Sequence, residues 1–83
     1  MSENTRVAVV SIIVEKPDCA NQINDILHAY SDYIIGRMGI PYREKNISII
    51  SVVMDAELDV INQASGKLGR VDGATVKTAY SKN

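Results

Sequence analysis

The sequence contains few of the residues that build metal, redox or nucleic-acid sites. Among its 83 residues there is one cysteine, which excludes a disulfide framework and a cysteine-based zinc finger. The formal net charge is −1, which excludes a nucleic-acid binder that works through bulk positive charge. Phenylalanine and tryptophan are absent and only four tyrosines are present, so the hydrophobic core must be aliphatic.

A membrane-spanning run is also missing. Val7–Val14 is apolar but far too short to cross a bilayer, and the charged residues Glu15 and Lys16 follow it directly. The run also lacks the small-residue cleavage site of a secretory leader. We therefore expect a cytoplasmic protein with no membrane partner, and the single unpaired Cys19 agrees with that compartment.

Four apolar segments predict β-strands. Val7–Val14 and Ile47–Met54 are rich in β-branched residues and apolar at both alternating positions, which is typical of strands covered on both faces. Shorter strands are predicted over Tyr33–Met38 and Ala74–Ala79. We expect Gly39–Tyr42 to end the second strand, because its proline cannot occupy a central strand.

Two segments between these strands predict helices. Apolar residues recur at helical spacing from Asp18 to Tyr30 and again from Ala56 to Leu68. We predict Asp55 as the N-cap of the second helix, because its carboxylate can accept hydrogen bonds from free backbone N–H groups. Gly69 is predicted to end that helix in the left-handed conformation.

The resulting order is strand–helix–strand, strand–helix–strand. This order is typical of the ferredoxin-like fold, an α+β βαββαβ sandwich in which two helices cover one face of a four-stranded antiparallel sheet. Right-handed crossovers place the first and third strands in the centre and the other two at the edges. We predict one domain over residues 1–83, with flexible ends at 1–5 and 80–83.

The two central strands carry more apolar side chains than two helices can cover. Whichever alternating set of Val7–Val14 meets the helices, the other set is left for solvent, and Ile47–Met54 poses the same problem. Association of identical subunits, sheet to sheet or edge to edge, would cover these side chains. We therefore predict a homo-oligomer, a dimer or a tetramer; the alternative is a monomer that tolerates surface valine and isoleucine.

No arrangement of residues indicates catalysis or metal binding. Cys19 and His28 are nine residues apart on the first predicted helix, which separates them by more than about 10 Å in rise and places them on opposite sides. The acidic residues are dispersed, and nucleophile-elbow, metalloprotease and P-loop motifs are absent. We predict a non-enzyme without metal or other cofactor.

The segment from Tyr33 to Arg43 concentrates tyrosine, arginine and glycine. Tyrosine and arginine are favoured at interfaces and anion sites because each combines apolar area with oriented donors. Three interpretations remain open, namely an ordinary edge strand, a subunit interface and a ligand site. The candidate ligand or interface residues are Tyr33, Arg37, Gly39, Tyr42 and Arg43.

Four segments also resemble a known protein family. They are Asn24–His28, Tyr33–Glu44, Ser65–Arg70 and Gly73–Lys77. With these segments in this order, the chain resembles the regulators of the iron-only hydrogenase system, short stand-alone ACT-like proteins, over about Val7 to Thr78. The resemblance implies an ACT-like ferredoxin fold, self-association and a regulatory role near hydrogenase maturation. It carries over no catalytic or ligand residue.

Two departures limit what the resemblance implies. Amino-acid-binding ACT domains use a glycine in the loop after the first strand, whereas that loop is Glu15–Asp18 here and has none. The related nickel-responsive regulators bind metal through several histidines and a cysteine, and this chain has one histidine and one cysteine. We therefore expect neither of these two binding modes.

The functional prediction is a non-enzymatic ACT-like regulatory module that acts as a homo-oligomer, with a protein partner or a small-molecule effector. The alternative is a small-molecule-binding ACT-like domain with a ligand pocket at the subunit interface, lined by Tyr33, Arg37, Tyr42 or Arg43. Direct DNA binding is not expected at a net charge of −1.

Overall fold

The computed structural model describes residues 4–82, and these form a four-stranded antiparallel sheet with two α-helices. The predicted order of elements is confirmed. In chain order the strands and helices are β1 (Thr5–Val14), α1 (Ala20–Ala29), β2 (Ile34–Tyr42), β3 (Ile47–Glu57), α2 (Leu58–Gly69) and β4 (Ala74–Tyr80). Short 3-10 turns stand before α1 (η1, Pro17–Cys19), before β2 (η2, Ser31–Tyr33) and before β3 (η3, Arg43–Lys45).

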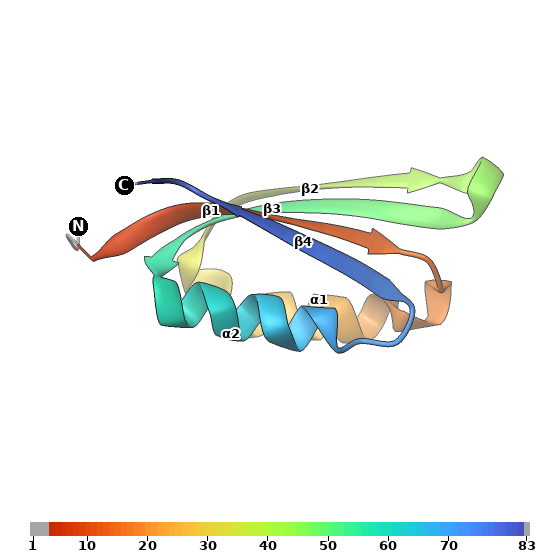
Figure 1. Cartoon of the computed structure of the whole chain (residues 1–83). Helices are drawn as coiled ribbons and strands as arrows, with labels where there is room; N and C mark the ends of the chain where they lie inside the picture. The colour runs from red at the N-terminus through yellow and green to blue at the C-terminus, as the bar shows by residue number, and fades with distance from the viewer. Residues whose placement is uncertain (1–3, 83) are drawn as a thin grey trace.

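The sheet has the order β2-β3-β1-β4, and each neighbouring pair is antiparallel. Both helices lie on the same side of it (Figure 1). The predicted α+β ferredoxin-like sandwich is therefore confirmed, with β1 and β3 in the centre and β2 and β4 at the edges. Neither helix in the described part of the chain is long and apolar enough to span a membrane.

The core lies between the helices and one face of the sheet, which we call the helix face. From β1 it takes the set Ala8, Val10, Ile12 and Val14, and each of these side chains is at most 2% exposed. β3 adds Ile50, Val52, Met54 and Ala56, and the helices add Ile23, Leu27, Ile61, Ala64 and Leu68. As the composition predicted, this core is almost entirely aliphatic.

The prediction that Gly39–Tyr42 ends the second strand is wrong. β2 continues through Pro41, which lies opposite Ser48 of β3, and ends at Tyr42. A proline is tolerated there because β2 is an edge strand, and one side of an edge strand needs no ladder hydrogen bond. The predicted start is also one residue early, since Tyr33 belongs to η2 and the strand begins at Ile34.

The predicted helix ends differ from the structure. Asp55 is not an N-cap, because β3 continues past it to Glu57, which precedes α2 and makes no side-chain capping bond. The extension buries Ala56 on the helix face. Gly69 is the last residue of α2, and the left-handed glycine is Gly73, with φ of 96°.

The described ends of the chain take part in strand pairing. Tyr80 belongs to β4, and the Ser81 backbone N–H donates a hydrogen bond to the Val7 carbonyl at 2.8 Å. Thr5 is the first residue of β1. Of the predicted flexible ends, residues 1–3 and 83 lie outside the described residues.

Candidate functional site: an open sheet face and an edge groove

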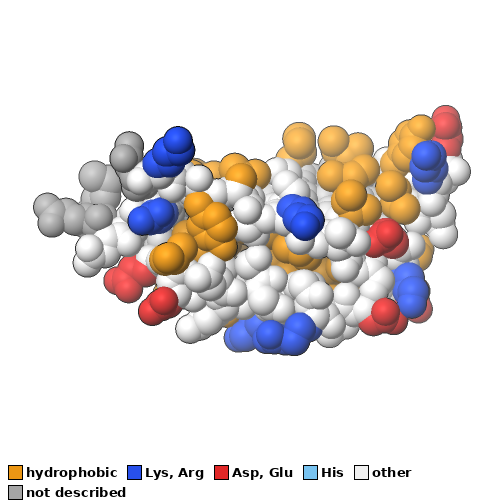
Figure 2. Space-filling view, in the orientation of Figure 1, with side chains coloured by type: hydrophobic (Ala, Val, Ile, Leu, Met, Phe, Trp, Pro, Cys, Tyr) orange, Lys and Arg blue, Asp and Glu red, His pale blue; other side chains and the backbone are white. Residues whose placement is uncertain are grey.

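The face of the sheet that turns away from the helices, which we call the open face, is apolar. β1 exposes Val7 (41%), Val9 (37%) and Ile13 (40%) on it. Hydrophobic side chains gather along the upper surface of Figure 2, above the sheet. Apolar residues that reach this face from β2 and β3 are Met38, Ile40, Tyr42, Ile47, Ile49 and Val53. The structure thus decides which alternating set the helices leave uncovered.

Strand pairing orders the open face into rows that cross the sheet from β2 to β4. One row is polar at its centre, and its members are Met38, Ser51, Ser11 and Lys77. The row toward the β2–β3 turn consists of Ile40, Ile49, Ile13 and Thr75. The row on the other side consists of Gly36, Val53, Val9 and Ala79. The serine row therefore separates two mainly apolar rows.

A groove runs along the helix face beside β2, where α1 does not reach the edge of the sheet. Its central part has a volume of about 310 Å³ and is lined by Val14, Ala20, Asn24, Arg37, Gly39, Ile40, Pro41, Ser48 and Ile50. The Arg37 Nη2 donates a hydrogen bond to the Asn24 Oδ1 at 2.9 Å and so joins β2 to α1. Among residues 4–82, Arg37 makes no ion pair.

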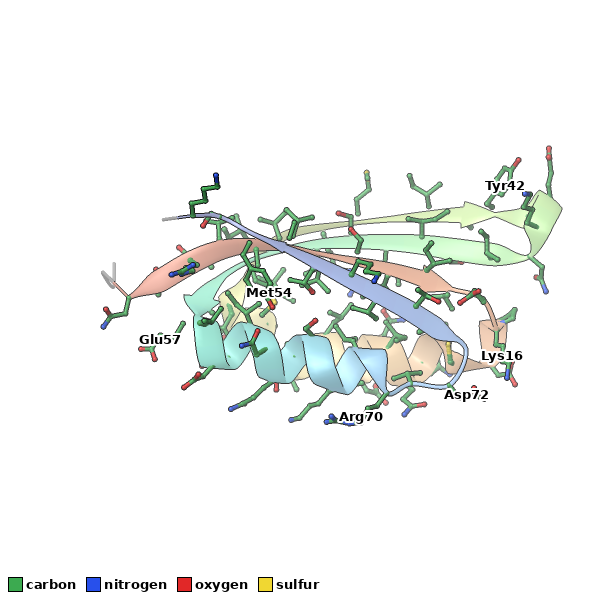
Figure 3. All side chains as sticks on the ribbon, in the orientation of Figure 1. Lys16, Tyr42, Met54, Glu57, Arg70 and Asp72 are labelled. Atoms are coloured by element: carbon green, nitrogen blue, oxygen red, sulfur yellow. The ribbon has the colours of Figure 1, made fainter. Side chains whose placement is uncertain are left out.

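The five predicted ligand or interface residues do not converge on one site. Arg37 and Gly39 pair with Val52 and Ile50, which places both on the helix face beside the groove. Tyr42 lies on the open face near the β2–β3 turn (Figure 3), and its hydroxyl donates to the Glu44 Oε2 at 3.1 Å.

The remaining two candidates lie beyond the two ends of β2. Tyr33 precedes β2, and its ring lies 6.4 Å from that of Tyr30. Arg43 follows β2 in η3 and lines only the end of the groove. Within β2, Arg37 and Gly39 are separated from Tyr42 because alternate residues of a strand point to opposite faces of the sheet.

The groove contains one polar partner that sequence reasoning did not single out. Asn24 appears in the sequence analysis only as the first residue of the resemblance segment Asn24–His28, yet its side chain accepts the hydrogen bond of Arg37 in the groove. Its position beside the buried stripe, three residues before Leu27 on the same helix, was the available signal. The contact between Asn24 and Arg37 depends on where α1 packs on the sheet, which the sequence alone does not specify.

The loop after β1 is held closed by contacts to the turn before β4. The backbone N–H groups of Glu15 and Lys16 donate to the Gly73 carbonyl at 2.7 and 3.2 Å. The Lys16 Nζ donates to the Asp72 Oδ2 at 3.0 Å, and the two residues lie at the same end of the molecule in Figure 3. This hydrogen bond and the attraction between the two charges raise the pKa of Lys16 above its usual value.

The residues with metal-binding potential stay apart. Cys19 is buried in η1, whereas His28 is exposed near the end of α1. Among residues 4–82, no three histidine, cysteine, aspartate or glutamate side chains come together. What the described surface offers is an apolar sheet face and a groove with an arginine–asparagine pair.

The chain is similar over nearly its whole length to a solved structure. That structure is of the uncharacterized protein TM1266 from Thermotoga maritima. The two chains superpose with a TM-score of 0.89 and share 38% sequence identity, and the match covers 94% of this chain and 99% of the other. No curated protein matches.

The model of one protein family matches residues 6–78, almost the same span as the resemblance noted in the sequence. That family is TM1266-like, and its description reads "Iron-only hydrogenase system regulator, putative". The match covers both central strands, both helices and the segment around Arg37. The chain therefore belongs to the TM1266-like family of iron-only hydrogenase system regulators.

Proposed function

We propose that the protein is a non-enzymatic regulatory module of the cytoplasm that works as a homo-oligomer built on its open sheet face. The regulatory role rests on membership of the family. Self-association rests on one structural observation, the largely apolar surface that β1, β2 and β3 present on the side away from the helices. Full burial of a fully exposed valine or isoleucine contributes about 1.5–3 kcal/mol, so covering one that is two-fifths exposed contributes about 1 kcal/mol, and covering several of them favours association.

A second copy of the chain suits this surface. The open face is mainly aliphatic and nearly free of charge, with Lys77 the one charged residue in its three central rows. Surfaces of this kind are typical of subunit interfaces, whose centres are depleted in charged side chains. Two such faces packed together form a sheet-on-sheet sandwich about 10 Å thick, as in other β proteins.

A single charge placed in the open face tests this proposal. Ile13→Glu puts a carboxylate in the row between Ile49 and Thr75, where the wild-type side chain is 40% exposed in one chain. We expect light scattering after size exclusion to show an oligomer for the wild type and a folded monomer for the variant. Gln63→Glu, at an exposed position of α2, is the control and leaves the oligomer intact. A wild-type monomer at micromolar concentration would refute self-association.

The second candidate function is binding of a small effector in the groove beside β2. The groove lies on the helix face, so a neighbouring subunit would complete it only by joining edge to edge along β2. The observation that favours it is the Arg37 guanidinium, fixed by Asn24 and without a carboxylate partner among residues 4–82. Guanidinium groups bind carboxylates through paired N–H donors. The apolar lining from Val14, Ala20 and Pro41 suits a small hydrocarbon group on the same ligand. The effector class is therefore a small carboxylate with an apolar substituent.

A thermal-shift screen with small carboxylates tests the groove. We expect a stabilising carboxylate to lose its effect in Arg37→Ala and to keep it in Arg70→Ala, which removes an arginine at the end of α2 instead. Arg43→Ala, at the far end of the groove, reduces the effect less than Arg37→Ala. If Arg37→Ala keeps the full shift, the groove is not the binding site.

A further inference from the structure

The rows of the open face also indicate how two copies stack, an inference that rests on the proposed self-association. Two identical sheets that pack face to face are related by a two-fold axis lying between them. That axis can run along the strands or across them. The two choices bring different residues into contact, so the row pattern can distinguish between them.

An axis along the strands lays every row on the same row of the partner. With the axis between β1 and β3, each central strand lies over the other central strand of the second copy. Ser11 then faces Ser51 of the partner subunit, where a water molecule can bridge the two hydroxyls, and the apolar rows meet apolar rows. Lys77 at one edge lies over Met38 of the partner subunit at the opposite edge. Its alkyl stem can cover the methionine while its ammonium group reaches water.

An axis across the strands is less compatible with the same pattern. If it follows the serine row, each Lys77 lies over Lys77 of the partner subunit, and two like charges meet at the rim of an apolar interface. If it follows the neighbouring row of Ile49 and Ile13, the serine row falls on the row of Tyr42 and Ile47. Ser51 would then lie over Ile47 of the partner subunit, and its hydroxyl would be buried against an aliphatic side chain, which is unfavourable.

We propose that two copies stack open face to open face with the two-fold axis along the strands, β1 of one chain over β3 of the other. The occupant of the open face is thus a second copy of this chain, chosen by the match of polar row to polar row and by the position of Lys77. The β2–β3 turns of the two chains then lie at the same end of the sandwich. An axis across the strands would send them to opposite ends.

The distance between the two β2–β3 turns separates these arrangements. With the axis along the strands, the strand spacing and sheet spacing put the two turns about 15 Å apart. With the axis across the strands on the serine row, about five residues of strand on each side of the axis separate them by about 35 Å. The molecule is 42 Å long, so the difference between the two expected distances is about half of its length.

Pulsed electron–electron double resonance on a spin-labelled β2–β3 turn measures the distance between the turns of the two chains. The label is placed at Lys45→Cys in η3, in a Cys19→Ala background so that the buried native cysteine does not react. A second label at Glu57→Cys, at the opposite end of β3, gives an independent reading. We expect each label to lie a short distance from the same label in the second chain, because equivalent strand ends then lie at the same end of the sandwich. Adding Ile13→Glu abolishes both distances, because it separates the two chains.

These experiments separate failure of the proposed axis from failure of self-association through the open face. An oligomer that Ile13→Glu dissociates but whose labels lie near 35 Å or beyond keeps the proposed function and overturns the axis along the strands. An oligomer that Ile13→Glu leaves intact overturns stacking through the open face. A monomer overturns both. A mixture of the wild type with Lys77→Glu adds a second readout, since only the crosswise axis makes mixed pairs form in preference to identical ones.

Discussion

At the residue scale, the structure depends most visibly on one glycine. Gly73 has φ of 96°, a conformation that side chains with a Cβ rarely adopt, and its carbonyl accepts the N–H groups of Glu15 and Lys16. A Cβ built on Gly73 would lie 2.7 Å from the Lys16 Cβ, which is the base of that side chain and cannot move aside easily. The turn before β4 and the loop after β1 are therefore fitted to each other.

Gly73→Ala tests this fit. We expect the variant to lower the free energy of unfolding by about 1–3 kcal/mol, because it combines backbone strain with a steric clash. Gly39→Ala is the matched control, since a Cβ there meets nothing within 4 Å and φ is not in the left-handed region. Urea denaturation of both variants measures the difference. Equal stabilities for the two variants would show that the turn adapts to a side chain.

Two predictions from residue type, the helix caps at Asp55 and Gly69, are wrong. Asp55 and Gly69 are suitable capping residues by chemistry, yet neither performs that role. β3 continues past Asp55 because pairing with β1 extends to Glu57 and buries Ala56. Local propensity is a weak influence, and tertiary pairing of this kind overrides it.

At the element scale, the edge strand β2 pairs with β3 on one side and carries features on its other side that discourage pairing with further strands. Its far side faces no other strand of the described chain, and such edges recruit further strands unless something blocks them. Pro41 lacks an N–H group, and the register shift between Ile34 and Gly36 disturbs the edge near its start. Sequence reasoning recognised the proline as a mark of an edge but ended the strand too early, because pairing opposite Ser48 is a tertiary contact.

Pro41→Val tests whether the proline protects this edge. The valine restores an N–H donor and a strong strand former, so we expect the fold to persist and aggregation to become faster, followed by light scattering at fixed concentration. Pro41→Lys is the control, because it restores the same donor but adds a charge that discourages edge pairing. Valine and lysine variants that both aggregate no faster than the wild type would contradict a protective role.

At the scale of the whole molecule, a single chain has an unusual distribution of apolar surface. On the two central strands the helix face is covered, whereas Val7, Val9 and Ile13 on the open face of β1 remain about two-fifths exposed. A domain of this size buries a limited share of its surface, so the extra burial gained by association matters more than in a larger protein.

Stability should therefore depend on protein concentration. When folding and association are coupled, mass action raises Tm as concentration increases. We expect the wild type to gain several degrees over a hundredfold increase in concentration, and Ile13→Glu to show a constant Tm. Differential scanning calorimetry measures both. A wild-type Tm that does not change with concentration would mean that association contributes nothing to its stability.

The amino-acid sequence was enough to derive the element order, the central and edge strands, the aliphatic core and the excess of apolar residues on the central strands. Those features follow from periodicity, crossover handedness and composition, which are local or topological. Packing in three dimensions decided which alternating set of β1 meets the helices, because both sets are apolar and either could fill a core. It also decided that Arg37 and Tyr42 face opposite sides and that Asn24 holds Arg37. Those facts depend on strand register and on where α1 lies over the sheet, and both are set by packing across the whole molecule.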